Sequence, residues 1–316
     1  MATARVVVPA RPTGGVTAAA PGACAWPGQP DLERKAVRAA MPWSEMQPSQ
    51  RRLSLAGIAV CALLMTLAVG HPAVRAFPAG QEFMSFLIPL RHGQEIDDYL
   101  LDSWSDTLED GSRTGFFRPV TSLVVLAEHA AWNGWFPGYA LVNLLLHAAC
   151  ATLAGLMVVR LTHSRRAGLA SSLLFAAHPA TVEAWGIVSN RGDILATLLS
   201  LAALLVLLRP CSGGGETRRI GPAILVGLLV LLAMWAKELG LAAAAAVPAA
   251  WILLPCVSRR RVPGIALGAS ILAALAIYSA IRLEVFDGLG GYGYVAPLSQ
   301  LPGKLACLAM QASGAS

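Results

Sequence analysis

The chain has 316 residues, of which 56% are hydrophobic and only 13% are charged. An ordinary soluble domain carries roughly 25% charged residues, so this composition excludes a typical soluble enzyme. A net charge of +6 could indicate nucleic-acid binding, but the basic residues form no single patch along the sequence, and we expect no nucleic-acid partner. The apolar residues should instead form runs that span a bilayer, which predicts an all-α, polytopic membrane helix bundle.

Residues 1–50 are rich in Ala, Pro, Gly and Arg and show no apolar periodicity. Such a segment cannot bury enough surface to order itself, so we expect a disordered cytosolic tail. The apolar run 53–70 then predicts the first membrane span. If Met41 or Met46 were the true start, this run would resemble a secretion signal followed by a cleavage site. We favour an uncleaved span because the run is longer than a usual signal core.

Six further apolar runs predict a bundle of about seven spans in all. Arginines follow every second span, and basic residues accumulate on the cytosolic side of a membrane, which predicts a cytosolic N-terminus. The preference for arginine over lysine further suggests a bacterial source, and hence a multi-pass protein of the bacterial inner (cytoplasmic) membrane. The six runs cover residues 138–159, 167 to about 188, 194–208, 220–235, 239–255 and 262–281.

The first outer loop, residues 71–135, is the longest and has the opposite charge balance, with nine acidic against four basic residues. It contains two amphipathic stretches, 83–90 and 120–132, which are too short to span and suit helices lying along the membrane surface. The transmembrane domain is expected to cover residues 51–281. Residues 282–316 are expected to form an outer loop and the start of a truncated further span.

Two adjacent carboxylates, Asp97 and Asp98, lie in this outer loop. Neighbouring carboxylates repel each other and therefore hold a proton more readily, which suits a group that must accept a proton in catalysis. A solvated surface pair is the alternative in so acidic a loop. Arg118 precedes the second amphipathic stretch, where its guanidinium could bind a phosphate in bidentate fashion or serve as an interfacial anchor.

Further polar residues interrupt the apolar runs. Asn143 and His147 lie one helical turn apart in the second span and are expected to hydrogen-bond within the bundle. Lys237 and Glu238 mark either an outer turn between two spans or a buried charge pair, and a ligand contact stays open. Ionisable residues at membrane depth are candidates for function by default. One outer hairpin brings together four more of them: His178, Glu183, Arg191 and Asp193.

An ion pair from Arg191 to Asp193 or Glu183 would close this hairpin, and it is the structural alternative to a ligand site. The histidine and the acids also invite a metal hypothesis, but no HExxH or similar spacing occurs. We therefore expect no metal and no cofactor, although a divalent metal is not excluded. The six cysteines form no CxxC pair, and no structural disulfide is expected.

Taken in order, these motifs resemble the membrane domain of the GT-C glycosyltransferases. The resemblance is to the transmembrane and tetratricopeptide-repeat O-mannosyltransferases and their bacterial relatives, and it extends from about residue 53 to residue 255. The motifs that carry it are Asp97-Asp98, Phe117-Arg118-Pro119-Val120, residues 139–148, residues 174–184, Asn190-Arg191-Gly192-Asp193 and Lys237-Glu238-Leu239-Gly240.

The resemblance implies an enzyme that transfers a mannose-like hexose from a polyprenyl-phosphate carrier to a protein or glycan acceptor on the outer side. Asp97 would act as the general base, and Asp98 would orient the acceptor. Arg118, Arg191 and Lys237 would hold the carrier phosphate, whose charge grows as it departs. The other candidates for binding carrier or sugar are His178, Glu183, Asp193 and Glu238.

Chains of this family continue with further spans and often with tetratricopeptide repeats, so we expect that this sequence is truncated at Ser316. The alternative function is therefore a non-catalytic membrane scaffold, or a truncated and inactive GT-C-like fragment.

Overall fold

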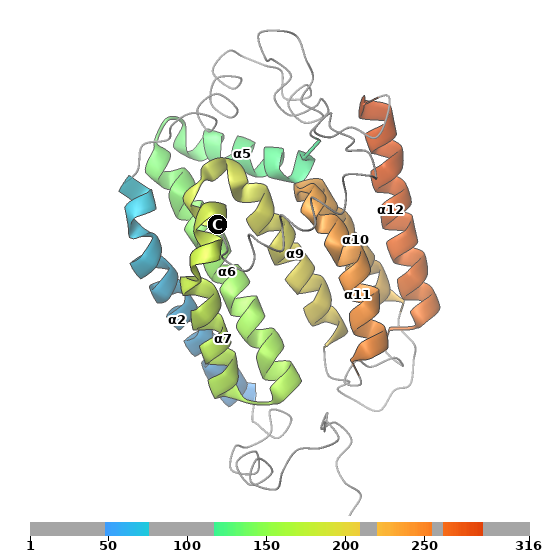
Figure 1. Cartoon of the computed structure of the whole chain (residues 1–316), viewed down its shortest axis with the longest axis horizontal. Helices are drawn as coiled ribbons and strands as arrows, with labels where there is room; N and C mark the ends of the chain where they lie inside the picture. Colours follow the sequence, from blue (N-terminus) through green and yellow to red (C-terminus); the bar gives the residue numbers. More distant parts are fainter. Residues whose placement is uncertain (1–47, 76–116, 209–219, 255–261, 287–316) are drawn as a thin grey trace, which may run out of the picture.

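The computed structural model describes residues 48–75, 117–208, 220–254 and 262–286, and within these ranges every element is helical (Figure 1). This confirms an all-α fold for the described part of the chain. The α-helices are α2 (Pro48–Arg75), α5 (Pro119–Trp132), α6 (Phe136–Thr162), α7 (Arg165–Ala177), α8 (Val182–Gly186), α9 (Arg191–Leu207), α10 (Gly221–Ala236), α11 (Leu241–Leu253) and α12 (Gly264–Phe286). Three short 3-10 helices join them: η2 (Pro179–Thr181), η3 (Val188–Asn190) and η4 (Glu238–Gly240).

Four helical segments in the described ranges are long and apolar enough to cross a membrane. They are Ser54–Arg75, Phe136–Thr162, Val188–Leu207 and Gly264–Val285. Helices α7, α10 and α11 have 13, 16 and 13 residues, which is shorter than the roughly 20 residues of a perpendicular span. The structure thus supports a multi-pass membrane protein, while the count of seven spans and the cytosolic N-terminus stay predictions.

The long helices run roughly parallel to one another (Figure 1). Helices α2, α6 and α7 pack together at one side, α9 packs between α6 and α10, and α12 packs on α10. Small residues allow some of these contacts: a Cβ on Gly155 of α6 would lie 2.8 Å from the carbonyl oxygen of Gly168 in α7, and the reverse distance is the same. The backbones of α6 and α7 can therefore approach only because both positions are glycine.

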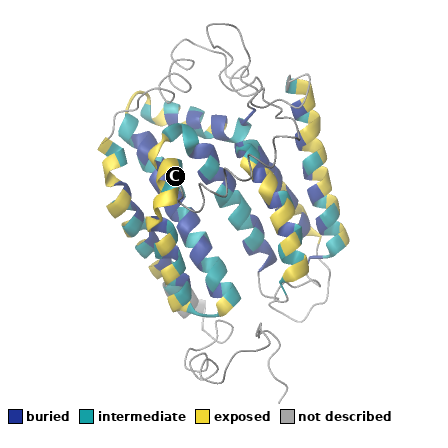
Figure 2. Cartoon of the chain, viewed as in Figure 1, coloured by how far each residue is buried: buried dark blue, intermediate teal, exposed yellow. Residues whose placement is uncertain are grey.

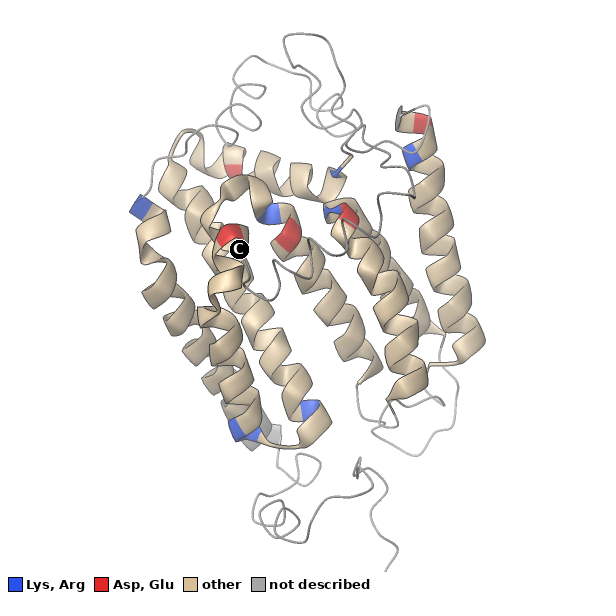
Figure 3. Cartoon of the chain, viewed as in Figure 1, with Lys and Arg blue, Asp and Glu red and all other residues tan. Residues whose placement is uncertain are grey.

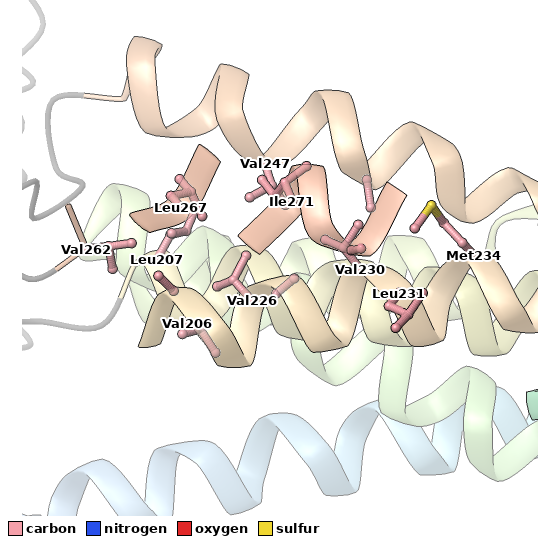
Figure 4. Packing of buried hydrophobic residues seen from close by; sticks show 14 of the residues in the cluster. Val206, Leu207, Val226, Val230, Leu231, Met234, Val247, Val262, Leu267 and Ile271 are labelled. Carbon is pink, nitrogen blue, oxygen red and sulfur yellow. The ribbon is translucent and has the colours of Figure 1, made fainter. Parts of the chain in front are cut away.

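The largest apolar core joins α9, α10, α11 and α12 (Figure 4). Val226, Val230 and Met234 recur every four residues along α10, so one face of this helix is buried against its neighbours. Other large apolar residues of α2, α11 and α12 are exposed (Figure 2). Ile265 and Leu253 are 90% and 74% exposed, as suits side chains that face lipid.

The apolar run 167–188 does not form one continuous helix, and this part of the sequence prediction is wrong. Helix α7 ends at Ala177, and η2, α8 and η3 follow before α9 begins at Arg191. The physical reason is Pro179, whose ring disfavours helical backbone at the preceding His178. His178 accordingly adopts an extended conformation, with φ −69° and ψ 125°.

The amphipathic stretch 120–132 forms α5, which lies across one end of the bundle (Figure 1). It packs on α6, α9 and α10. A helix over this stretch is thus confirmed, while its place along the membrane surface stays a prediction. The stretch 83–90, the acidic pair Asp97-Asp98, residues 287–316 and nearly all of the expected tail 1–50 lie outside the described residues, so those predictions stay untested.

Candidate functional site

Residues of both charges gather at the end of the bundle that α5 covers (Figure 3). Four ion pairs lie there within the described ranges, and they connect α5, α9, the turn after α10 and α12. The pairs are Arg118 with Glu238 at 2.8 Å, Lys237 with Asp193 at 2.6 Å, Arg282 with Glu238 at 3.5 Å, and Arg191 with Glu128. Segments far apart in sequence thus meet in one polar layer on an apolar bundle.

Arg191 is completely buried at the start of α9. Its Nε donates to Oδ1 of Asn143 at 2.7 Å, and its Nη2 donates to the Tyr139 carbonyl at 2.9 Å. Its Nη1 donates to the carboxylate of Glu128 on α5. Burial raises the pKa of Glu128 to about 7, against the opposing effect of the Arg191 charge. Arg191 therefore joins α5, α6 and α9, and this geometry encloses its guanidinium within the protein.

The structural alternative of an ion pair from Arg191 to Asp193 or Glu183 is wrong, because Arg191 pairs with Glu128. Residues two positions apart on a helix point in different directions, so Arg191 and Asp193 cannot face each other on α9. Asp193 instead accepts a hydrogen bond from Nζ of Lys237. Both side chains of this pair are about one quarter exposed, at 26% and 22%.

Helices α5, α9 and α10 approach one another closely beside this pair. The Thr121 hydroxyl of α5 donates to the carbonyl of Ala236 at 2.7 Å. A Cβ at Gly192 of α9 would lie 2.8 Å from the same carbonyl oxygen. Gly192 is therefore required for the approach of α9 to the end of α10, which brings Asp193 within reach of Lys237.

Glu238 accepts hydrogen bonds from two arginines. Its Oε2 receives Nε and Nη2 of Arg118 at 3.3 and 2.8 Å, and its Oε1 receives Nη1 of Arg282 at 3.5 Å. Burial alone would raise the pKa of Glu238, but the charges of Arg118 and Arg282 outweigh burial and lower it. Glu238 is therefore a carboxylate at neutral pH. Lys237 and Glu238 mark the predicted turn between two helices, with each side chain paired elsewhere.

His178 and Glu183 lie apart from these ion pairs, and both are exposed. His178 accepts a hydrogen bond from the Ala180 amide at 3.2 Å and so caps η2. The Glu183 carbonyl accepts from the Asn190 side chain. The structure thus brings Arg118, Asp193, Lys237 and Glu238 into one layer and leaves His178 and Glu183 on the surface.

Asn143 and His147 hold the bundle together, as the sequence predicts. The Asn143 side chain donates to the carbonyls of Trp185 and Ile187 at 3.3 and 3.2 Å. A ring nitrogen of His147 lies 3.4 Å from the carbonyl of Ala176 in α7. Both side chains are buried, so they hold α7 and the segment between α7 and α9 against α6.

Sequence reasoning missed Glu128 and Arg282 as site residues. Glu128 is one of nine acids in the outer loop, and only its position among the apolar residues of an amphipathic stretch distinguishes it from the others. Arg282 directly follows the predicted span 262–281. An ionisable residue at the end of a span is a candidate for function, as Arg191 is, and this signal could have identified Arg282. Within the described ranges, no group of three His, Cys, Asp or Glu residues could hold a metal ion.

Comparison with known proteins finds similarity to several protein O-mannosyl-transferases. The chain is 34% identical over 143 residues to the protein O-mannosyl-transferase Tmtc1 of Drosophila melanogaster and 32% identical over 142 residues to TMTC2 of Mus musculus. It is 26% identical over 158 residues to the protein O-mannosyl-transferase F38B6.6 of Caenorhabditis elegans. The chain resembles the TMTC protein O-mannosyltransferases. This similarity confirms the family resemblance that the ordered motifs suggest.

The alignments with the TMTC proteins cover 45%, 44% and 48% of this chain. They cover 16%, 17% and 22% of the relatives, so the chain spans about a sixth to a fifth of the length of these curated proteins. No family model matches the chain, and no solved structure matches it.

Proposed function

We propose that this chain acts as a membrane glycosyltransferase that moves a mannose-like hexose from a polyprenyl-phosphate carrier to a protein or glycan acceptor on the outer side of the membrane. The observation that carries this proposal is the similarity to several protein O-mannosyl-transferases. The charged layer at one end of an apolar bundle supports it, because a carrier lipid needs an apolar surface for its tail and cations for its phosphate.

In this proposal, the carrier phosphate binds near Arg118 and Lys237. Both cations lie where α5 meets the turn after α10, and Lys237 is partly exposed. As the bond between the sugar and the phosphate breaks, negative charge grows on the departing phosphate. Cations held in place before the reaction stabilise this charge without further reorganisation. Arg191 is enclosed by its partners, so we assign it to holding α5, α6 and α9 in position instead.

The acidic pair supplies the remaining chemistry of the proposal. Asp97 takes the proton from the acceptor hydroxyl, and the resulting oxygen forms a bond to the anomeric carbon of the sugar. The bond from that carbon to the phosphate breaks on the opposite side, which inverts the configuration. Asp98 orients the acceptor. Asp193 offers a partly exposed carboxylate for sugar hydroxyls within the charged layer. His178 and Glu183 lie apart from this layer, so we assign them no contact with the sugar.

Sugar transfer in membranes tests this proposal directly. Membranes that contain the chain would receive radiolabelled polyprenyl-phosphate mannose or glucose, and label in protein or glycan would be measured. We expect transfer with the unchanged chain, loss of transfer with Asp97→Asn, and near-normal transfer with Asp102→Asn. The last variant is a matched control, because it removes one carboxylate from the same acidic loop.

Membrane insertion of each variant would be checked by alkaline extraction. Transfer that persists in Asp97→Asn would remove Asp97 from the mechanism. An inserted chain that transfers neither sugar would contradict the transferase and favour the non-catalytic scaffold.

A further inference from the structure

The carboxylate of Glu238 lies between two guanidinium groups that come from segments far apart in the sequence. Arg118 directly precedes α5, and Arg282 lies near the end of α12. Arg118 donates two hydrogen bonds to one carboxylate oxygen, and Arg282 donates to the other. Two guanidinium groups that converge on one anion are the arrangement that proteins use for carboxylate and for phosphate alike.

The two arginines are held more firmly than the carboxylate between them. The side chains of Arg118 and Arg282 are 7% and 10% exposed, whereas that of Glu238 is 29% exposed. Arg282 also donates to the Tyr278 hydroxyl at 3.1 Å, and its guanidinium lies 5.7 Å from the centre of the Tyr278 ring. Glu238 is therefore the member of the cluster with room to move away.

We propose that Glu238 occupies an anion site that belongs to a ligand phosphate. When a phosphate ester binds, its oxygens replace the carboxylate on Arg118 and Arg282, and Glu238 turns toward solvent. No covalent bond changes in this exchange. The inference rests on the proposed function, because it specifies how the carrier phosphate would enter the site and adds Arg282 as its second arginine.

In this exchange, Glu238 competes with the ligand for the two arginines. The direction in which a change at Glu238 alters the affinity for phosphate therefore tests the proposal. Removal of the competing carboxylate should strengthen phosphate binding. If Glu238 instead oriented Arg118 for the ligand, or contacted the ligand itself, the same change would weaken binding. Removal of the Arg282 guanidinium should weaken binding in either case, so Glu238 is the position that discriminates.

The test is direct binding to the purified full chain in detergent, with farnesyl phosphate as the probe and farnesol as the uncharged control. We expect Glu238→Gln to lower the Kd of farnesyl phosphate about tenfold and Arg282→Gln to raise it about tenfold or more. Arg282→Lys should lie between the unchanged chain and Arg282→Gln, because it keeps the charge but loses the planar fork. Glu284→Gln is the matched control on the same helix, and its Kd should not change.

Thermal unfolding in the same detergent would show that each variant is folded. If Glu238→Gln does not fold, Glu238→Asp provides the test, because its shorter side chain should compete less and still lower the Kd. Unchanged or weaker binding in the folded Glu238 variant would overturn the proposal, as would equal binding of farnesyl phosphate and farnesol.

Inorganic phosphate would be measured in parallel. Binding of inorganic phosphate as tight as that of farnesyl phosphate would overturn the assignment to a lipid phosphate. The expected order of affinities without any sugar transfer would support the anion site and contradict the transferase, so the two proposals can fail separately.

Discussion

Arg191 offers the clearest test of how the charged layer holds the bundle together. The change Arg191→Met keeps much of the side-chain volume and removes the guanidinium. It breaks the ion pair to Glu128 and the hydrogen bonds to Asn143 and the Tyr139 carbonyl at once. Because these partners lie on α5 and α6, the loss should loosen both helices from α9.

The expected loss of unfolding free energy follows from the burial of this pair. Removal of one partner of a buried ion pair typically costs about 3–5 kcal/mol, since the other charge stays buried without compensation. Glu128 can relieve part of this cost by taking up a proton, because burial raises its pKa to about 7. The lost hydrogen bonds to neutral acceptors add about 1 kcal/mol each. We therefore expect Arg191→Met to cost about 4 kcal/mol.

A double-mutant cycle separates the ion pair from the other contacts of Arg191. Once the guanidinium is gone, Glu128→Gln removes the isolated carboxylate and should do little further harm. The double variant should therefore be more stable than the sum of the two single changes by about 2 kcal/mol, as expected for residues in direct contact.

The assay is reversible unfolding in mixed micelles with increasing SDS, followed by tryptophan fluorescence. Arg166→Met is the matched control, because Arg166 is exposed at the other end of the bundle. Its change should stay within about 0.5 kcal/mol, as is usual at the surface. A loss of unfolding free energy below about 1 kcal/mol for Arg191→Met, or strict additivity in the double-mutant cycle, would refute the idea that Arg191 holds α5, α6 and α9 together.

Three further predictions follow from the same layer. The pKa of Glu128 rises from 4.5 to about 7 on folding, so the folded state binds this proton more tightly than the unfolded state. The free energy of unfolding should therefore fall as the pH rises from about 4.5 to about 7. SDS unfolding at several pH values measures this fall, which should be smaller in Glu128→Gln. Gly192→Ala would place a Cβ 2.8 Å from the Ala236 carbonyl oxygen and should lower the melting temperature clearly, whereas Gly268→Ala, with open space around it, should not. The Lys237–Asp193 pair is partly exposed, so Lys237→Met should cost about 1 kcal/mol or less, yet it should strongly reduce sugar transfer if Lys237 binds the carrier phosphate.

The sequence alone predicts most of the helices with useful accuracy. The run 138–159 lies within α6, and the run 220–235 differs from α10 by one residue at each end. These helix boundaries can be predicted from the sequence because the apolar runs end where proline, glycine or charged residues begin. The break of the run 167–188 was the main error, although Pro179 was visible in it and explains the end of α7 at Ala177.

The sequence also determines the kind of protein. Low charge and long apolar runs require a surrounding of lipid or of other helices, and the ordered motifs point to the family that the comparisons support. Arg118, Asp193, Lys237 and Glu238 could be selected as candidates because an ionisable side chain beside an apolar run is costly unless it is paired or used.

Only the tertiary structure decides which of these charges meet. The Arg118–Glu238 and Arg191–Glu128 pairs join residues 120 and 63 positions apart, and the local pair that the sequence offered as an alternative for Arg191 does not form. Helical periodicity fixes which face a side chain occupies, but not which helix packs against that face. The neighbours follow from the close packing of apolar surfaces, which brings α9 between α6 and α10 and lays α5 across their ends.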